Sequence, residues 1–100
     1  MKYKLSNKAT QDLENIWLYT FENWSAEQAD RYINLIFDEV EYLCLNPKSG
    51  INLENVRKGY FRSKVKSHLI FYKINQKQNI VEIIRILHEM MDVESHLHTK

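Results

Sequence analysis

The sequence predicts an α+β fold in which a short strand and a helical hairpin precede a three-stranded antiparallel meander. Two apolar stripes with helical spacing occupy the first half of the chain, and alternating apolar stretches fill the second half. The only long loop expected between them covers residues 46–58. With 100 residues, one Pro and two Gly, the chain fits one domain over residues 1–100, ending in a tail from about residue 90.

The first predicted elements are a short strand, Lys2–Leu5, and a helix that ends at about Trp24. Ser6 suits the helix N-cap, because its hydroxyl can accept a free N–H of the first turn. Residues at spacings of three and four define one helical face, and they are Ala9, Leu13, Ile16, Trp17, Thr20 and Trp24. We therefore expect Trp17 and Trp24 in the core.

The second predicted helix starts after Ser25 and ends near Leu45. Gln28 follows Ser25 by three residues, which is a capping-box pattern, and Pro47 disfavours helical geometry in the residue before it. Its apolar stripe comprises Ala29, Tyr32, Ile33, Ile36, Phe37, Val40, Leu43 and Cys44. The two stripes are expected to face each other as an antiparallel hairpin, with Cys44 in the core.

Three strands are predicted after the loop, at Tyr60–Val65, Ser67–Ile74 and Ile80–Leu87. The spacers between them are too short for a parallel crossover, so the strands should be antiparallel neighbours. Leu5 and its neighbours can add an edge strand.

The last of these strands is apolar on both faces. Strict alternation puts one set on the first face (Val81, Ile83, Arg85 and Leu87) and the other set on the second (Ile80, Glu82, Ile84, Ile86 and His88). The second apolar face requires cover, either from the C-terminal segment or from another protein, and we expect a partner to contribute.

Charge is divided unevenly along the chain. Asp12 to Glu41 contains eight acids and one base, Arg31, whereas Arg57 to Arg85 contains eight bases and one acid. This separation fits either two solvated faces or a basic surface directed at an anionic partner.

Several classes of protein and site are excluded or disfavoured. A lone cysteine cannot form a disulfide within the chain, and no apolar run approaches a membrane span. No signal peptide is visible, so we expect a cytoplasmic protein. There is no glycine-rich phosphate loop or zinc pattern, and the spacing of His88, His96 and His98 matches no common metal site. We therefore expect no cofactor and no metal.

The residues best suited to chemistry are the bases of the first meander strand and its neighbours. Arg62, Lys64 and Lys66 should share one strand face with Tyr60, and Arg85 and His88 lie on a later strand. Cations with a Tyr and a His suit metal-independent RNA cleavage, which needs phosphate stabilisation and proton transfer. The same face suits phosphate binding without cleavage, or an acidic protein segment.

An ordered set of motifs resembles the ParE toxins of the RelE/ParE superfamily, the toxin halves of bacterial toxin–antitoxin pairs that include plasmid stabilisation systems. The set runs along nearly the whole chain. It comprises Leu5-Ser6, Ala9, Asp12-Leu13, Ile16-Trp17, Tyr19-Thr20, Trp24, Gln28-Ala29, Tyr32, Asn46-Pro47, Gly50, Val56-Arg57-Lys58-Gly59-Tyr60, Arg62-Ser63, Ser67-His68-Leu69-Ile70-Phe71-Tyr72, Ile84-Arg85-Ile86-Leu87-His88, Met91-Asp92 and Leu97.

The resemblance implies the RelE/ParE-like fold and a hetero-oligomer with a ParD-like antitoxin that wraps the toxin. It also implies inhibition of DNA gyrase and replication by a protein that is not itself an enzyme. Relatives of the RelE type instead cut messenger RNA on the ribosome, which is the alternative function. A diverged toxin that retains only antitoxin binding is a third reading.

The residues around His88 favour a gyrase inhibitor over a ribonuclease of the RelE type. For a ribonuclease, the matching residues would be Arg62, Lys64, Arg85 and His88, but Glu89 follows His88 where RNA-cutting relatives have Tyr. No Tyr occurs after Tyr72. We expect His68 and His88 to be mainly structural. For antitoxin binding, the hypothesis names Tyr19, Arg57, Tyr60, Arg62, Tyr72 and Arg85.

Overall fold

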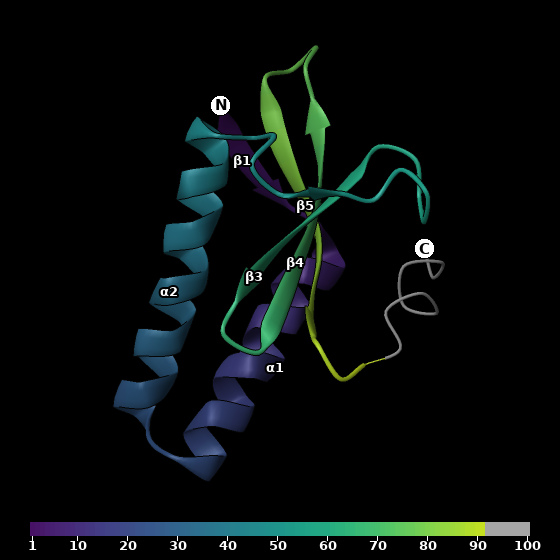
Figure 1. Cartoon of the computed structure of the whole chain (residues 1–100). Coiled ribbons are helices and arrows are strands. Elements are labelled where there is room, and N and C mark those ends of the chain that lie inside the picture. Colours follow the sequence, from purple (N-terminus) through teal and green to yellow (C-terminus); the bar gives the residue numbers. More distant parts are fainter. Residues whose placement is uncertain (92–100) are drawn as a thin grey trace.

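The computed structural model describes residues 1–91, in which two helices pack on one face of a five-stranded sheet (Figure 1). The element order confirms the predicted α+β class. In chain order the elements are β1 (Lys2–Leu5), α1 (Asn7–Asn23), α2 (Ala26–Leu45), β2 (Ile51–Asn52), β3 (Tyr60–Val65), β4 (His68–Asn75) and β5 (Ile80–His88).

Both helices begin at the serine caps predicted from the sequence. The Ser6 hydroxyl accepts the Ala9 N–H at 2.9 Å, and the Ser25 hydroxyl accepts the Gln28 N–H at 3.1 Å. Each hydroxyl satisfies one amide that has no partner within its own helix. The caps therefore fix where α1 leaves the sheet and where α2 returns along it.

The strand order in the sheet is β1-β5-β4-β3-β2. The pairs β3–β4 and β4–β5 are antiparallel, which confirms the meander. β1 is an edge strand parallel to β5, a pairing that is possible because most of the chain, the helical hairpin included, separates the two strands. The short β2, which pairs antiparallel with β3, was not predicted and lies in the expected loop.

The strict alternation predicted for β5 is wrong, because the strand contains a β-bulge. Phe71 pairs with Arg85 and Tyr72 pairs with Ile83, which leaves Ile84 without an opposite residue. The side chains after the bulge consequently change face. Val81 and Ile83 share the helix-side core with Ile86, whereas Leu87 joins Ile84 on the outer face.

The main core lies between the helices and the sheet. Its fully buried members include Ile36 and Val40 of α2 and Ile70 of β4, and Cys44 packs against it. The prediction that Trp24 belongs to the core is wrong, since 66% of its surface is exposed. Trp24 is the C-cap of α1, beyond the last turn that faces the sheet. Trp17 is half-buried, and its indole N–H donates to Asp30 at 2.8 Å.

A second, smaller apolar cluster lies on the outer face of the sheet, as the two-sided pattern of the last strand predicted. It consists of Tyr60, Leu69, Phe71 and Leu87, with Leu53 and Ile84 packed against it. Leu53 comes from the loop before β3, so the loop supplies part of the cover. The expected C-terminal cover falls on residues 92–100, which lie outside the described residues, and the expected partner cover stays a prediction.

Candidate functional site

The basic side chains of β3 lie on the outer face of the sheet, opposite the helices. Phe61 and Val65 pack against the helix-side core, so Arg62 and Lys64 share the outer face with Tyr60, as the alternation predicted. Lys66 does not extend this row, because it lies in the β3–β4 turn with a left-handed φ of 54°. The outer face thus holds two of the three expected cations.

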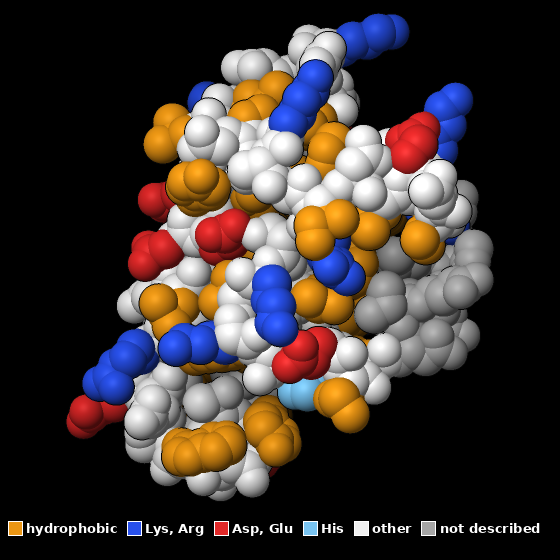
Figure 2. Space-filling model, viewed as in Figure 1, with side chains coloured by type: hydrophobic (Ala, Val, Ile, Leu, Met, Phe, Trp, Pro, Cys, Tyr) orange, Lys and Arg blue, Asp and Glu red, His pale blue; other side chains and the backbone are white. Residues whose placement is uncertain are grey.

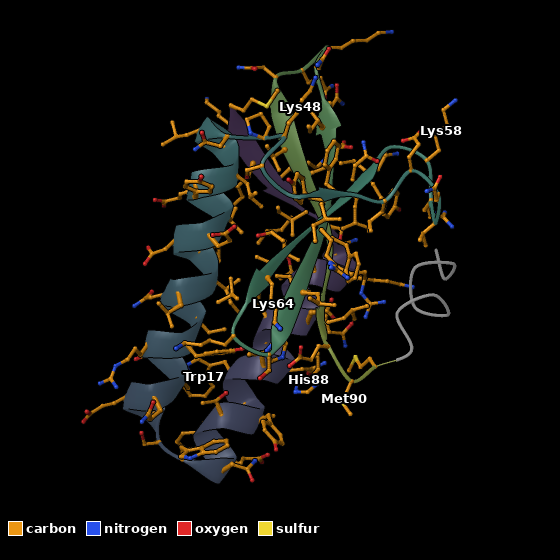
Figure 3. The ribbon with its side chains drawn as sticks, viewed as in Figure 1. Trp17, Lys48, Lys58, Lys64, His88 and Met90 are labelled. Carbon is orange, nitrogen blue, oxygen red and sulfur yellow. The ribbon has the colours of Figure 1, made fainter. Side chains whose placement is uncertain are left out.

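Lys64 is already paired with a carboxylate of the same chain. Its Nζ lies 3.0 Å from Glu89 Oε1, and both side chains are well exposed to solvent. The hydrogen bond and the positive charge of Lys64 lower the pKa of Glu89 below its usual value. Figure 3 shows Lys64 at the end of the sheet that also carries His88. An anion approaching Lys64 must therefore compete with Glu89.

Arg85 forms a second, more buried ion pair with Asp12 of α1. Its Nε and Nη2 donate to the two carboxylate oxygens at 2.9 and 3.0 Å, and the Ile86 N–H also donates to Oδ2 at 2.9 Å. The side chains of Arg85 and Asp12 are only 14% and 11% exposed. The bond to Asp12 raises the pKa of Arg85 above its usual value. This pair fastens α1 to the bulge of β5.

The two histidines stand directly opposite each other on β4 and β5. The Tyr32 hydroxyl lies 2.6 Å from His68 Nδ1, and the rings of His68 and His88 meet edge to face at 5.2 Å. His88 Nδ1 accepts the Met90 N–H at 3.1 Å. Burial, followed by the neighbouring His88, lowers the pKa of His68 to about 4, so this imidazole is neutral at pH 7. Both rings are held by local contacts, and the mainly structural role expected for them stays a prediction.

The residues proposed for antitoxin contact lie in different environments. Tyr19 is 62% exposed on α1, and Arg57 stacks over the ring of Tyr60 at 5.4 Å. Tyr60 belongs to the outer apolar cluster and is 8% exposed. Arg62 is partly exposed and makes no ion pair with a carboxylate of residues 1–91. Arg85, as described, is occupied by Asp12.

Tyr72 was named for antitoxin binding, and this assignment is wrong because the side chain does not reach the surface. The side chain is fully buried, and its hydroxyl donates to the Pro47 carbonyl at 2.8 Å and accepts the Gly50 N–H at 3.1 Å. It anchors the loop between α2 and β2 instead. Gly50 is required at this point, because an added Cβ would lie 2.5 Å from the Tyr72 hydroxyl and 2.8 Å from the Arg62 carbonyl oxygen.

A groove of about 490 Å³ opens where the connected ends of α1 and α2 face the β3–β4 turn. We call it the hairpin groove. Its lining is Tyr19, Thr20 and Trp24 of α1 and its C-cap, Gln28, Arg31, Tyr32 and Leu35 of α2, and Lys66, Ser67, His68 and His88 of the sheet. A neighbouring hollow of about 350 Å³ shares Tyr19, Thr20, His68 and His88 and extends to Met91.

The hairpin groove was not predicted from the sequence, although two signals for it were present. Arg31 is the only base between Asp12 and Glu41, and it lines the groove. Trp24 follows the last helical turn of α1, where an aromatic side chain can extend past the sheet. Figure 2 shows Lys or Arg, His and hydrophobic side chains close together at this end of the molecule.

No group of three or more His, Cys, Asp or Glu side chains within residues 1–91 is arranged to hold a metal ion. Within the same residues, neither helix is long and apolar enough to cross a membrane.

Comparison with known proteins places this geometry in a family. Toxin ParE1 of Caulobacter vibrioides is 39% identical over 95 residues, which cover 95% of this chain and 96% of that protein. Toxin ParE1 of Mycobacterium tuberculosis is 31% identical over 96 residues, or 96% of this chain and 97% of that protein.

Two solved structures share the fold. A chain of the chromosomal ParDE toxin–antitoxin system from P. aeruginosa aligns with a TM-score of 0.76 at 19% identity, covering 88% of this chain and 95% of that one. A chain of the toxin–antitoxin complex RelBE2 from Mycobacterium tuberculosis aligns with a TM-score of 0.56 at 16% identity, covering 87% and 95%. The family model for the ParE toxin of the type II toxin–antitoxin system parDE matches residues 3–93, and the chain therefore belongs to the ParE toxin family.

Proposed function

We propose that this ParE-family toxin inhibits DNA gyrase and thereby replication, and that a ParD-like antitoxin neutralises it in a hetero-oligomeric complex. Membership of the family supports the antitoxin partner, because its model describes the toxin of a parDE system. The chain that shares this fold with a TM-score of 0.76 comes from a ParDE system.

The observation that carries the choice of target is that two of the three cations expected of a nuclease, Lys64 and Arg85, pair with carboxylates of the same chain. A metal-independent nuclease needs free cations beside the phosphate and groups that transfer protons. Here Asp12 holds Arg85 in a nearly buried pair, and Glu89 places a negative charge beside Lys64 that opposes the approach of a phosphate. This arrangement favours a toxin that acts by binding, so gyrase inhibition is preferred to ribosome-dependent cleavage of messenger RNA.

The experiment combines the purified protein with DNA gyrase, ATP and relaxed plasmid, and measures both supercoiling and trapped double-strand cleavage. We expect supercoiling to fall and cleaved DNA to accumulate, and we expect the antitoxin encoded beside the toxin to reverse both effects. The His88→Gln variant is the control. A nuclease would need His88 for proton transfer, whereas a toxin that inhibits gyrase by binding should retain its effect without this residue.

Two other results would contradict the proposal. Cleavage of messenger RNA on ribosomes, abolished by His88→Gln, would establish the RelE-type alternative. Antitoxin binding without any effect on gyrase or on ribosomes at micromolar protein would indicate a diverged toxin that retains only its partner.

A further inference from the structure

The chemistry of the hairpin groove suits a segment that carries both negative charge and an apolar side chain. Its hairpin wall presents Tyr19, Trp24 and Leu35, all of them exposed large hydrophobic residues. Arg31 and Lys66 lie on opposite walls, and neither forms an ion pair with a carboxylate of residues 1–91. Among residues 1–91, no Asp or Glu belongs to the lining of this groove.

The surroundings of the groove favour a peptide over a nucleic acid. The hairpin segment from Asp12 to Glu41 carries eight acids, and Arg31 is its only base. A phosphate backbone running past the groove would meet that negative surface, and like charges in close approach oppose association. A peptide needs to place only one or two carboxylates between the walls.

Glu89 places a carboxylate just outside the groove, since neither Glu89 nor Lys64 belongs to its lining. It follows His88, a lining residue, and its carboxylate lies 3.0 Å from Lys64 Nζ. Its N–H donates to the Ser67 carbonyl at 2.8 Å, so its backbone is fixed beside the β3–β4 turn. The ion pair is exposed, and an exposed pair exchanges partners at little cost in free energy.

We propose that the hairpin groove binds an acidic segment of the antitoxin, and that Glu89 is an internal competitor whose place on Lys64 a carboxylate of that segment takes. This inference rests on the proposed antitoxin partnership and adds the binding surface and a residue that limits affinity. An apolar side chain of the segment packs on Tyr19 and Trp24. Its carboxylates pair with Arg31 and Lys66 in the groove and, beyond the edge of the groove, with Lys64 on the outer face of the sheet.

The test measures the affinity of the antitoxin encoded beside the toxin for single variants of the full-length toxin. We expect Glu89→Gln to raise the affinity about threefold to tenfold, because the partner no longer displaces a carboxylate. Arg31→Gln and Lys66→Gln should each lower it about threefold to tenfold, and Trp24→Ala about tenfold or more. All four side chains are exposed, so folding should be retained.

Two controls make the test specific. Lys77→Gln removes the same charge from the β4–β5 turn, at the opposite end of the molecule in Figure 1, and should change affinity less than about twofold. In the Lys64→Gln background, Glu89→Gln should no longer raise the affinity, because the shared cation is absent. This double-mutant cycle separates competition for Lys64 from a general effect of charge.

The possible failures are distinguishable. If the antitoxin binds but the groove variants and Glu89→Gln behave like Lys77→Gln, the groove is not the docking site, while the proposed antitoxin partnership stands. If no complex forms with the wild-type toxin, the partnership and this inference both fail. If Glu89→Gln instead strengthens binding of a single-stranded oligonucleotide and leaves antitoxin affinity unchanged, the groove binds nucleic acid and the proposal is overturned.

Discussion

The two ion pairs of this toxin use the same chemistry in different environments. Asp12 and Arg85 share two hydrogen bonds in a setting where both side chains are nearly buried, and the carboxylate also accepts a backbone N–H. Lys64 and Glu89 share one contact between side chains that are 58% and 38% exposed. The buried pair therefore fastens a helix to the sheet, whereas the exposed pair is exchangeable.

The largest expected effect is on the buried pair. Asp12→Ala should lower the free energy of unfolding by about 3 kcal/mol, because Arg85 would keep a nearly buried charge and the Ile86 N–H would lose its acceptor. Urea denaturation followed by circular dichroism measures this. A loss below about 1 kcal/mol would show that water replaces the carboxylate, and would remove the distinction between the two pairs.

The partners and the burial of each ion pair could not be predicted from the sequence, although most of the fold could. The serine caps, the apolar stripes and the strand spacing depend on near neighbours in the chain. The structure confirms them, except that Trp24 at the end of the first stripe is exposed. Arg85 and Asp12 are 73 residues apart, so no local pattern pairs them. The bulge at Ile84 is also absent from the alternating pattern, and it turns Leu87 to the outer face.

The candidate site was predicted only in part, for a related reason. Alternation placed Arg62 and Lys64 correctly on the outer face, since the strand period is local. It could not show that Tyr72 is buried and fixed to Pro47, or that Trp24 extends from the end of α1 into a groove. Both depend on where the helices end relative to the sheet.

The second expected effect concerns the geometry of the buried pair. Arg85→Lys keeps the positive charge but cannot reproduce two parallel hydrogen bonds to one carboxylate. We expect a loss of about 2 kcal/mol in the free energy of unfolding, smaller than for Asp12→Ala, because the charge of Asp12 stays compensated. Equal losses for the two variants would mean that hydrogen-bond geometry, and not charge compensation, determines the contribution of this pair.

A third effect is expected at His68, which is half-buried and forms no ion pair within residues 1–91. Its pKa is about 4 in the folded protein, against an ordinary value of 6.5, because of burial and of the neighbouring His88, while Asp12 and Glu89 act in the opposite direction. The unfolded chain therefore binds more protons between these two values, and stability falls as pH decreases from about 6.5 toward 4. With allowance for partial exposure, we expect a loss of about 1 kcal/mol.

Other groups titrate in the same range, so the measurement is a difference. The free energy of unfolding of the wild type and of His68→Gln should be compared between pH 7 and pH 4.5, since glutamine can still form a hydrogen bond with the Tyr32 hydroxyl without gaining a proton. The wild type should lose more stability than the variant. If the free energy of unfolding falls equally with pH in the wild type and in His68→Gln, the pKa of His68 is the same in the folded and unfolded states. That result would contradict the lowered pKa expected for this half-buried imidazole.

The smallest expected effect belongs to the exposed pair. Lys64→Gln should change the melting temperature no more than Lys77→Gln does, because Glu89 loses only a contact that solvent already weakens. Thermal denaturation at low and at high salt measures this, with Lys77→Gln as the variant of equal charge. A clear loss of stability for Lys64→Gln alone would mean that the pair with Glu89 holds the end of β5 in place, so that a partner could not displace Glu89 without weakening the fold.

An unchanged melting temperature leaves Lys64 free to exchange carboxylates, which is the property that binding through the hairpin groove requires.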